Sequence, residues 1–358
     1  MRNINLQADV QDGSLLMIRL AEEGNRWTAL ACVDAASGDR RRLLTPVRVQ
    51  GGNHNLAWSE ATQKEAAKQT LNLRNKIAAL DRLALVSTRF SEHFSAARVF
   101  VFGDIAEGER ESWWFCQQVL RLIEEYMDRM VIAQVDYDQR RLHPNMSGIL
   151  DSMDFATSHE PSAMATVVSF QTILKYVRPP GIALTWGVKG AGHLGSRIIR
   201  LIAGRAWHVY VAERLPDRQS AIAQLDNVSI VDGDVIANVS ADAIIFAADS
   251  GSLNMHVANV IAANERVAVF GGPEAGLDRH INAIQKLALA DKWFVPSVLC
   301  GSLGLVSNLE EVLNHPLDID AQAHRLESIV SVMAEQAYVR HVPFHEICSM
   351  VLRGIESI

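Results

Sequence analysis

Residues 181–214 read GIALTWGVKGAGHLGSRIIRLIAGRAWHVYVAER. An apolar run over residues 182–188 leads into the glycine-rich sequence Gly190-Ala191-Gly192-His193-Leu194-Gly195. A helical pattern follows, and a second apolar run over residues 208–212 ends at Glu213. Short apolar runs on either side of a glycine turn and an amphipathic segment predict a strand, a turn, a helix and a second strand.

Each part of this unit has a physical role in holding a dinucleotide. Gly190 would allow the tight turn, a side chain at Gly192 would hold the pyrophosphate away, and one at Gly195 would push the helix off the sheet. The free N–H groups at the start of the helix, at His193 and Leu194, would then face the phosphates. An ordinary glycine turn in a sheet that binds nothing is the alternative, and the two flanking strands and the acidic residue argue against it.

Glu213 lies 23 residues after Gly190, at the end of the second predicted strand. A carboxylate at this place accepts hydrogen bonds from the ribose hydroxyls of the adenosine and repels a 2′-phosphate, which favours NAD. Arg214 follows it directly and could pair with a 2′-phosphate, so NADP stays open as the alternative.

The α/β alternation continues beyond Glu213. Residues 243–248 and 267–270 form two further buried apolar runs, and residues 254–263 between them are helical in pattern. Because ligands of parallel sheets bind at the carboxyl ends of the strands, we expect Ala248, Asp249 and Gly271 to face the same crevice as Gly192.

Length and charge limit the class of protein. The chain has 358 residues, of which 49% are hydrophobic and 21% charged, as in globular proteins with room for two cores. The net charge of -7 argues against nucleic acid and anionic membranes as partners. No apolar run is long enough to span a bilayer and the N-terminus is polar, so we expect a cytoplasmic protein. The four cysteines are far apart and predict neither a metal site nor disulfides.

The remaining periodicity predicts a two-domain α/β protein. Strands are expected at residues 15–20, 27–33, 99–102 and 131–135, helices at 60–79, 113–130 and 162–177, and a mostly helical C-terminus from 309. We assign residues 1–146, with the C-terminal helix 326–358, to a substrate and oligomerisation domain. Residues 147–325 are assigned to a Rossmann dinucleotide-binding domain.

Several segments resemble the glutamate, leucine, phenylalanine and valine dehydrogenase family, in a layout similar to the leucine and tryptophan dehydrogenases. Gly51-Gly52 resembles the glycine pair on the family's substrate side, and Lys76 falls at its first active-site lysine. Residues 154–157, DFAT, resemble the family's DFVTG turn, and residues 248–254, ADSGSLN, resemble its CALGGVIN segment. The resemblance extends over nearly the whole chain.

The resemblance implies a homo-oligomer that exchanges a hydride between a nicotinamide coenzyme and the α-carbon of an amino acid. Lys76 would hold the substrate carboxylate, with Gly51 and Gly52 nearby. A second lysine of lowered pKa and an aspartate would manage the protons of water and ammonia. Asp136 is the candidate aspartate, one position from the family's site, so that a one-residue slip along the strand would bring it into place.

The second lysine is replaced. Counting from Lys76, its position falls on Thr88, with Arg89 beside it. A threonine hydroxyl is not a base near neutral pH and arginine stays protonated, so neither can do the work of a lysine that must release a proton. The family's paired asparagines fall on Glu274 and Ala275; Glu274 could place the nicotinamide carboxamide or be an exposed loop acid, and we favour the exposed acid.

Three hypotheses follow. The first is an active oxidoreductase with a changed substrate or proton relay, such as one that reduces a preformed imine, with Lys76, Asp136, His54 or His93 as proton donors. The second is a protein that keeps the fold and has lost catalysis, acting as a cofactor-binding or regulatory partner. The third is ordinary amino acid deamination in which Arg89 or another residue reaches into the site.

Overall fold

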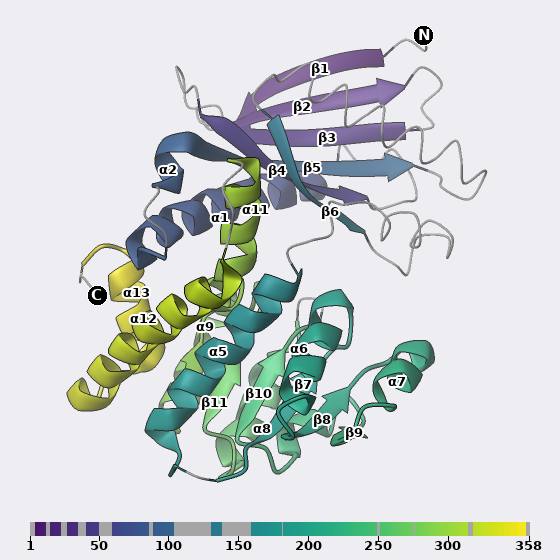
Figure 1. The fold of residues 1–358 in the computed structure, drawn as a ribbon. Helices are drawn as coiled ribbons and strands as arrows, with labels where there is room; N and C mark the ends of the chain where they lie inside the picture. The colour runs from purple at the N-terminus through teal and green to yellow at the C-terminus, as the bar shows by residue number, and fades with distance from the viewer. Residues whose placement is uncertain are drawn as a thin grey trace. The chain divides into compact units, whose positions relative to one another are not determined.

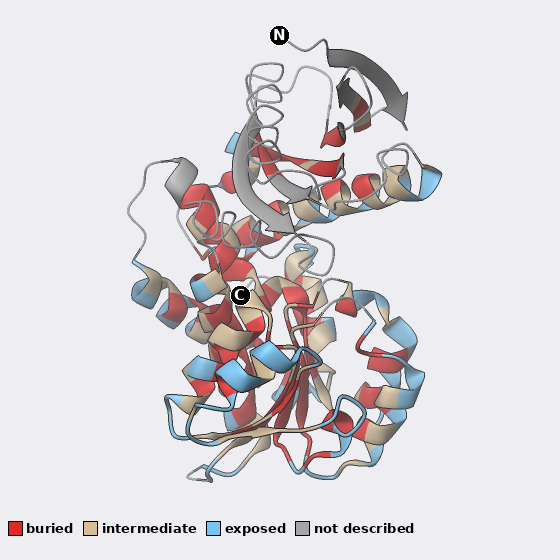
Figure 2. Cartoon of the chain, turned by 90° about the vertical axis from the view of Figure 1, so that its right-hand side faces the viewer, coloured by how far each residue is buried: buried red, intermediate tan, exposed pale blue. Residues whose placement is uncertain are grey.

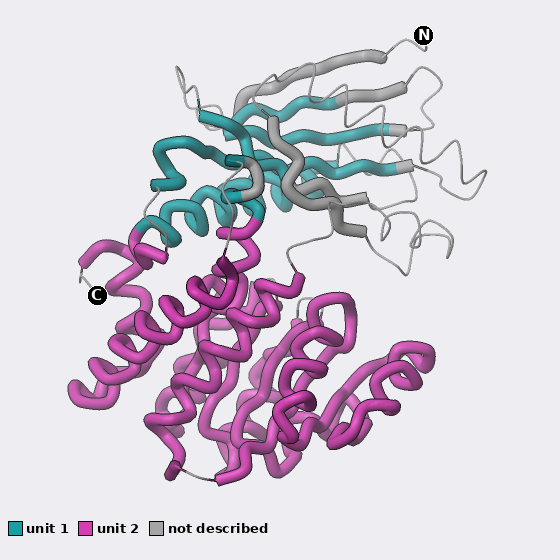
Figure 3. The backbone as a smooth tube through the Cα atoms, viewed as in Figure 1, with its two compact units in different colours: residues 1–81, 87–157, 308–316 teal, residues 82–86, 158–307, 317–358 magenta. Residues whose placement is uncertain are grey.

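The computed structural model describes residues 4–11, 15–22, 27–34, 41–49, 59–85, 89–103, 130–137, 159–180, 182–248, 251–274, 276–313 and 318–355. The chain divides into two compact units (Figure 3). Unit 1 comprises residues 1–81, 87–157 and 308–316, and unit 2 comprises residues 82–86, 158–307 and 317–358. The expected two-domain α/β architecture is therefore confirmed.

Unit 1 is built on a six-stranded sheet in the order β1-β2-β3-β5-β4-β6. Neighbours from β1 to β5 are antiparallel, whereas β4 runs parallel to both β5 and β6. The strands expected at residues 15–20 and 27–33 are confirmed as the antiparallel pair β2 and β3. The strands are β1 (Ile4–Gln11), β2 (Leu15–Glu22), β3 (Trp27–Asp34), β4 (Arg42–Val49), β5 (Phe94–Gly103) and β6 (Met130–Tyr137).

Alternation along these strands builds the core of unit 1. Side chains of β2, β3 and β5 two residues apart, such as Leu30 and Cys32 or Phe100 and Phe102, share one face and are buried. Helix α1 (Glu60–Leu83) adds Ala66 to this cluster, and the short α2 (Phe90–His93) precedes β5. The helix expected at 113–130 lies outside the described residues up to residue 129, and Met130 begins β6.

Unit 2 contains a six-stranded parallel sheet in the order β12-β11-β10-β7-β8-β9. The strand order reverses between β7 and β10, so right-handed crossovers place helices on opposite faces. Helices α5 and α6 lie on one face and α8 and α9 on the other (Figure 1). The strands are β7 (Thr185–Lys189), β8 (His208–Ala212), β9 (Val228–Ile230), β10 (Ala243–Phe246), β11 (Val269–Gly271) and β12 (Trp293–Val295).

The helices of unit 2 cover a sheet whose central strands are fully buried (Figure 2). Among the described residues, no helix is long and apolar enough to cross a membrane. The helices are α5 (His159–Val177), α6 (His193–Ala203), α7 (Pro216–Ile222), α8 (Met255–Ala263), α9 (Ile281–Ala288), α10 (Ser297–Cys300), α11 (Ser302–Val312), α12 (Ile319–Arg340) and α13 (Phe344–Leu352). Between them lie the 3₁₀ turns η3 (Ile236–Asn238) and η4 (Leu277–Arg279).

Two details differ from the sequence-based expectation. The apolar residues 298–301 suggest a strand by sequence, but residues 297–300 form the helix α10, with Pro296 at its N-cap. The C-terminal segment was assigned to the N-terminal domain, but residues 317–358 belong to unit 2. The reason is the packing of α12 along α5, where Lys175 pairs with Glu327 at 2.6 Å and the Tyr176 and Ser331 hydroxyls lie 2.7 Å apart.

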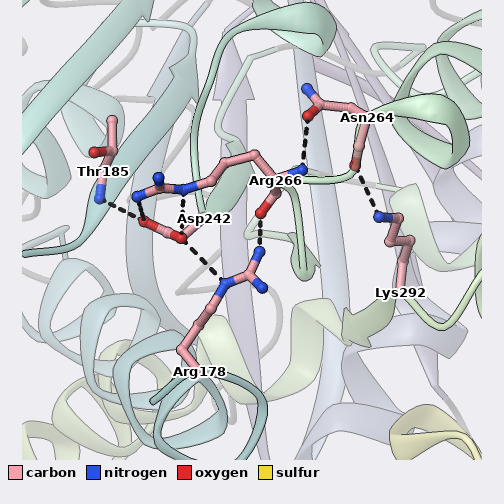
Figure 4. A network of polar contacts seen from close by, with 6 residues as sticks. All are labelled: Arg178, Thr185, Asp242, Asn264, Arg266 and Lys292. Carbon is pink, nitrogen blue, oxygen red and sulfur yellow. Dashed lines mark hydrogen bonds and ion pairs between the residues drawn. The ribbon is translucent and has the colours of Figure 1, made fainter. Parts of the chain in front are cut away.

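A buried carboxylate ties together the amino ends of the strands in unit 2 (Figure 4). Asp242, only 1% exposed, accepts hydrogen bonds from Arg178 Nε at 3.1 Å and from the backbone N–H of Thr185 at 2.9 Å. Arg266 donates to both carboxylate oxygens, at 2.8 and 2.9 Å, and this pairing raises the pKa of its guanidinium. The network fixes β7, β10 and the end of α5 at the edge opposite to the glycine turn.

We expect Asp242→Asn to lower the free energy of unfolding by about 3 kcal/mol, because it leaves two arginines facing a neutral amide in a buried site. Urea unfolding followed by tryptophan fluorescence measures the effect. Glu265→Gln, which changes an exposed acid next to Arg266, serves as the control and should change stability by less than about 0.5 kcal/mol. Equal stability of the two variants would contradict the assigned role of Asp242.

Candidate functional site

The glycine turn lies where the strand order reverses. Gly190 follows β7 with φ +98°, a left-handed conformation that side chains rarely adopt. A Cβ atom on Gly190 would also lie 2.8 Å from the Cα of Ala248, just beyond β10. The turn therefore packs directly against the end of the neighbouring strand, and only glycine fits at position 190.

Gly195 is needed for the packing of α6. A Cβ atom there would lie 2.1 Å from the carbonyl oxygen of Gly190 and 3.5 Å from the Cβ of Ala247. Since no real contact is that short, a side chain would force α6 away from the sheet. The first turn of the helix is thus held as close to β7 as the backbone allows.

Gly192 differs from the other two glycines. Its φ of -67° is open to any residue. Among the described residues, its chain neighbours and its own helix backbone apart, a Cβ atom there would meet only Nη1 of Arg218 within 4 Å, at 3.6 Å, which is ordinary van der Waals contact. Nothing in the described fold requires glycine at this position. The bare backbone faces open space, as a close-binding ligand would need.

The start of α6 borders that space. Gly192 is its N-cap and supplies no side-chain cap, and the first turn holds no acidic residue. The ring of His193 stacks on that of His159 from α5, with centroids 5.7 Å apart and planes 13° apart. A helix N-terminus with backbone donors and no acidic cap favours an anion in front of His193 and Leu194.

Glu213 is fixed at the end of β8, facing the same turn. Its Oε2 accepts the N–H of Ala191 at 2.7 Å, and its Oε1 accepts those of Arg214 at 2.7 Å and Leu215 at 3.0 Å. Each carboxylate oxygen has two acceptor sites, so the group keeps capacity for a further donor such as a ribose hydroxyl. Arg214 is exposed beside it.

The opposite half of the sheet presents a buried acid. Gly271 and Gly272 have φ of +145° and +141°, and a Cβ on either would lie within 2.4 Å of a backbone oxygen of β10 or β12. This tight turn carries Glu274 inward, so that it is 2% exposed, and the expectation of an exposed loop acid is wrong. Its Oε1 accepts the N–H of Ser252 at 2.9 Å.

Burial controls the ionisation of Glu274. Desolvation raises its pKa above the ordinary carboxyl value, and the hydrogen bonds from Ser252 and the charge of Lys189 oppose that rise. Its Oε2 has no hydrogen-bond partner among the described residues. Ala248 and Gly271 both lie at this edge, as expected, whereas Asp249 lies outside the described residues.

The candidate residues Lys76 and Asp136 of unit 1 lie on different elements, the helix α1 and the strand β6. Lys76 lies two residues after Arg74 on α1, and Arg74 reaches Asp34, which also accepts a 2.7 Å hydrogen bond from Ser95 near the start of β5. This part of α1 therefore lies near the beginning of β5. Gly51, Gly52, His54 and Thr88 lie outside the described residues.

Asp136 occupies a different level of the same sheet. On β6 its backbone is in register with Arg48 of β4, which is in turn in register with Phe100 of β5. Phe100 is five residues beyond Ser95, or about 16 Å along the strand. The backbone thus does not bring Lys76 and Asp136 to the same end of the sheet.

The sequence did not indicate that Arg218 lies next to the glycine turn. It lies on α7, five positions after Glu213, and no spacing rule marks it. The burial of Glu274 had a signal in the preceding Gly271-Gly272-Pro273, a sharp turn that leads the chain back over the sheet.

Solved structures share this architecture. L-tryptophan dehydrogenase from Nostoc punctiforme matches with a TM-score of 0.64 at 12% identity, over 94% of this chain and 95% of that one. The hetero-hexameric glutamate dehydrogenase from Thermus thermophilus matches with 0.63 at 14% identity, over 99% and 87%. Glutamate dehydrogenase from Plasmodium falciparum gives 0.59 at 11%, over 98% and 80%. The chain has the fold of these amino acid dehydrogenases.

Comparison of the sequence gives no match, in contrast to comparison of the structure. No protein-family model matches the chain, and no curated protein matches it. With identities of 11 to 14% to the structural neighbours, the likeness resides in the backbone.

Gly192 and Gly195 form a matched pair for mutation. We expect Gly195→Ala to lower the free energy of unfolding by about 3 kcal/mol, because its methyl group meets a backbone oxygen. Gly192→Ala should keep wild-type stability and weaken coenzyme binding about 10- to 100-fold, since the added methyl group occupies the ligand's space. Thermal unfolding and NADH titration measure the two effects. A Gly192→Ala variant that binds NADH normally would contradict this reading of the turn.

Glu274 should make stability depend on pH. Its folded-state pKa is raised, so the unfolded state ionises first as the pH increases from about 4. Relative to the neutral variant Glu274→Gln, the wild type should lose stability through this range and level off above the raised pKa. Urea unfolding of both proteins between pH 4 and 8 tests the sign. A wild type that gains stability relative to the variant would contradict a raised pKa of Glu274.

Proposed function

We propose that the protein is an NAD(P)-dependent oxidoreductase of the amino acid dehydrogenase type, acting on CH–NH₂ or C=N groups. Gly192 is the observation that carries the proposal, because its bare backbone faces open space in front of an uncapped helix. A dinucleotide pyrophosphate fits that requirement in both shape and charge. Bound nicotinamide would supply the hydride acceptor or donor.

NAD is the proposed coenzyme. Glu213 is held by three backbone N–H groups beside the turn, where its carboxylate would meet the adenosine ribose. A 2′-phosphate would be placed against this negative charge, which disfavours NADP by repulsion. Arg214 offsets part of that repulsion, so NADP remains the second candidate.

The proposed reaction is hydride transfer at the α-carbon of an amino acid or its imine. In the reductive direction the hydride goes to the imine carbon and a proton to the nitrogen, giving the amine. A preformed imine needs no activated water, so the reaction tolerates threonine at the position of the family's second lysine. Lys76, Asp136, His54 and His93 are the proposed proton donors, with Gly51 and Gly52 on the substrate side. As in the family it resembles, we expect a homo-oligomer.

The separation of Lys76 and Asp136 along the sheet favours a second candidate function. A chain that binds the coenzyme without a working proton relay would act as a cofactor-binding or regulatory partner. Such a protein would retain the glycine turn and Glu213 but would turn over neither amino acids nor imines.

Coenzyme titration and turnover distinguish the candidates. Trp186, buried in β7 four residues before Gly190, should transfer excitation energy to bound NADH, and NADPH should bind more weakly. We expect consumption of NADH with a cyclic imine and none with a 2-oxo acid plus ammonia. Coenzyme binding without either turnover would favour the second candidate. Failure of both reduced coenzymes to bind at millimolar concentration would refute both.

A further inference from the structure

Arg218 stands at the open side of the glycine turn. It lies on α7, and its Nη1 is 3.6 Å from the Cβ position on Gly192, nearer than any other atom of the described residues outside the neighbouring chain and helix backbone. The guanidinium therefore borders the space that the missing side chain leaves open. The N-terminus of α6 borders the same space, because Gly192 is its N-cap.

The guanidinium of Arg218 has no partner within the described part of the chain, although the residue is partly buried. The neighbouring polar side chains of the turn bind other groups. The side-chain amide of Gln219 donates to the carbonyl oxygen of Glu213, and the carboxylate of Glu213 accepts three backbone N–H groups. A guanidinium has five N–H donors and stays charged at all accessible pH values. Arg218 thus presents guanidinium N–H donors to the turn that no described residue accepts.

We propose that Arg218 binds the diphosphate of the dinucleotide, on the side opposite to the N-terminus of α6. The inference rests on the proposed function and adds to it a residue that fixes the coenzyme. Backbone donors at a helix N-terminus carry a partial charge of about +0.5, well below the two negative charges of a diphosphate. A guanidinium supplies a full charge and two parallel N–H donors that match phosphate oxygens.

The position of Arg218 separates its role from that of Arg214. Arg214 adjoins Glu213, at the place where the adenosine ribose would bind, and is exposed. It would contribute to the choice between NADH and NADPH, which differ at the ribose. Arg218 contacts the glycine turn, so it would bind a group that both coenzymes share.

The experiment measures dissociation constants of the full-length protein for NADH, NADPH, ADP-ribose and adenosine by calorimetry. Arg218→Gln should weaken NADH, NADPH and ADP-ribose about 10- to 100-fold alike and leave adenosine unchanged. Arg218→Lys keeps the charge but loses the two parallel N–H donors of the guanidinium. Its dissociation constants should lie between those of the wild type and of Arg218→Gln. Arg200→Gln, at the exposed far end of α6, is the control and should bind as the wild type does. Thermal unfolding checks that each variant is folded.

Salt dependence supplies a second readout. The affinity of the wild type for ADP-ribose should fall more steeply with ionic strength than that of Arg218→Gln, because one charge pair is missing in the variant. If the wild type binds but Arg218→Gln binds equally well, this inference fails and the proposed function stands. Equal weakening of adenosine would indicate stacking on the base and would also overturn it. If the wild type binds neither coenzyme, the inference and the proposed function fail together.

Discussion

The approach of α6 to β7 at Gly190 and Gly195 is the constraint on which the proposed coenzyme site depends. A Cβ on Gly195 would lie 2.1 Å from the carbonyl oxygen of Gly190, so the helix starts directly above the end of the strand. This closeness sets the direction of the helix axis toward the space in front of Gly192. It also leaves room for Glu213 to accept the N–H of Ala191 across the turn. The anion site is thus made from backbone groups whose positions follow from packing.

The two edges of the sheet in unit 2 differ in whether their buried polar groups have partners within the protein. At the amino edge, Asp242 is buried with its charge compensated by Arg178 and Arg266, so the network is complete without a ligand. At the carboxyl edge, Arg218 lacks a counter-ion and one oxygen of Glu274 lacks a donor among the described residues. A ligand bound at the carboxyl edge would supply the missing partners of both groups.

Local features of the fold were predictable from the sequence, and long-range ones were not. The turn at Gly190 and the close packing at Gly195 follow from the six-residue glycine sequence 190–195, which lies between two apolar runs, and the structure has that turn. The packing of α12 on α5 brings together residues far apart in the chain, such as Lys175 and Glu327. The periodicity of either helix shows which face is buried but does not show which helix packs against it. The position of Arg218 was not predictable for a similar reason, since its closeness to Gly192 arises only in the folded chain. The burial of Glu274 depends on how one glycine turn folds back over β10.

The coenzyme half and the reactive half of the proposed site differ in how far they depend on side chains. Binding at the turn uses backbone donors and the absence of a Cβ, which survive almost any change of sequence that preserves the strand and helix. Proton transfer needs a titratable side chain within hydrogen-bond reach of the substrate. A backbone shared with amino acid dehydrogenases at 12 to 14% identity is therefore compatible with intact coenzyme binding and with replaced proton donors at the same time. Reduction of a preformed imine fits this combination, because it keeps the hydride geometry and requires one proton in place of the several exchanged during deamination.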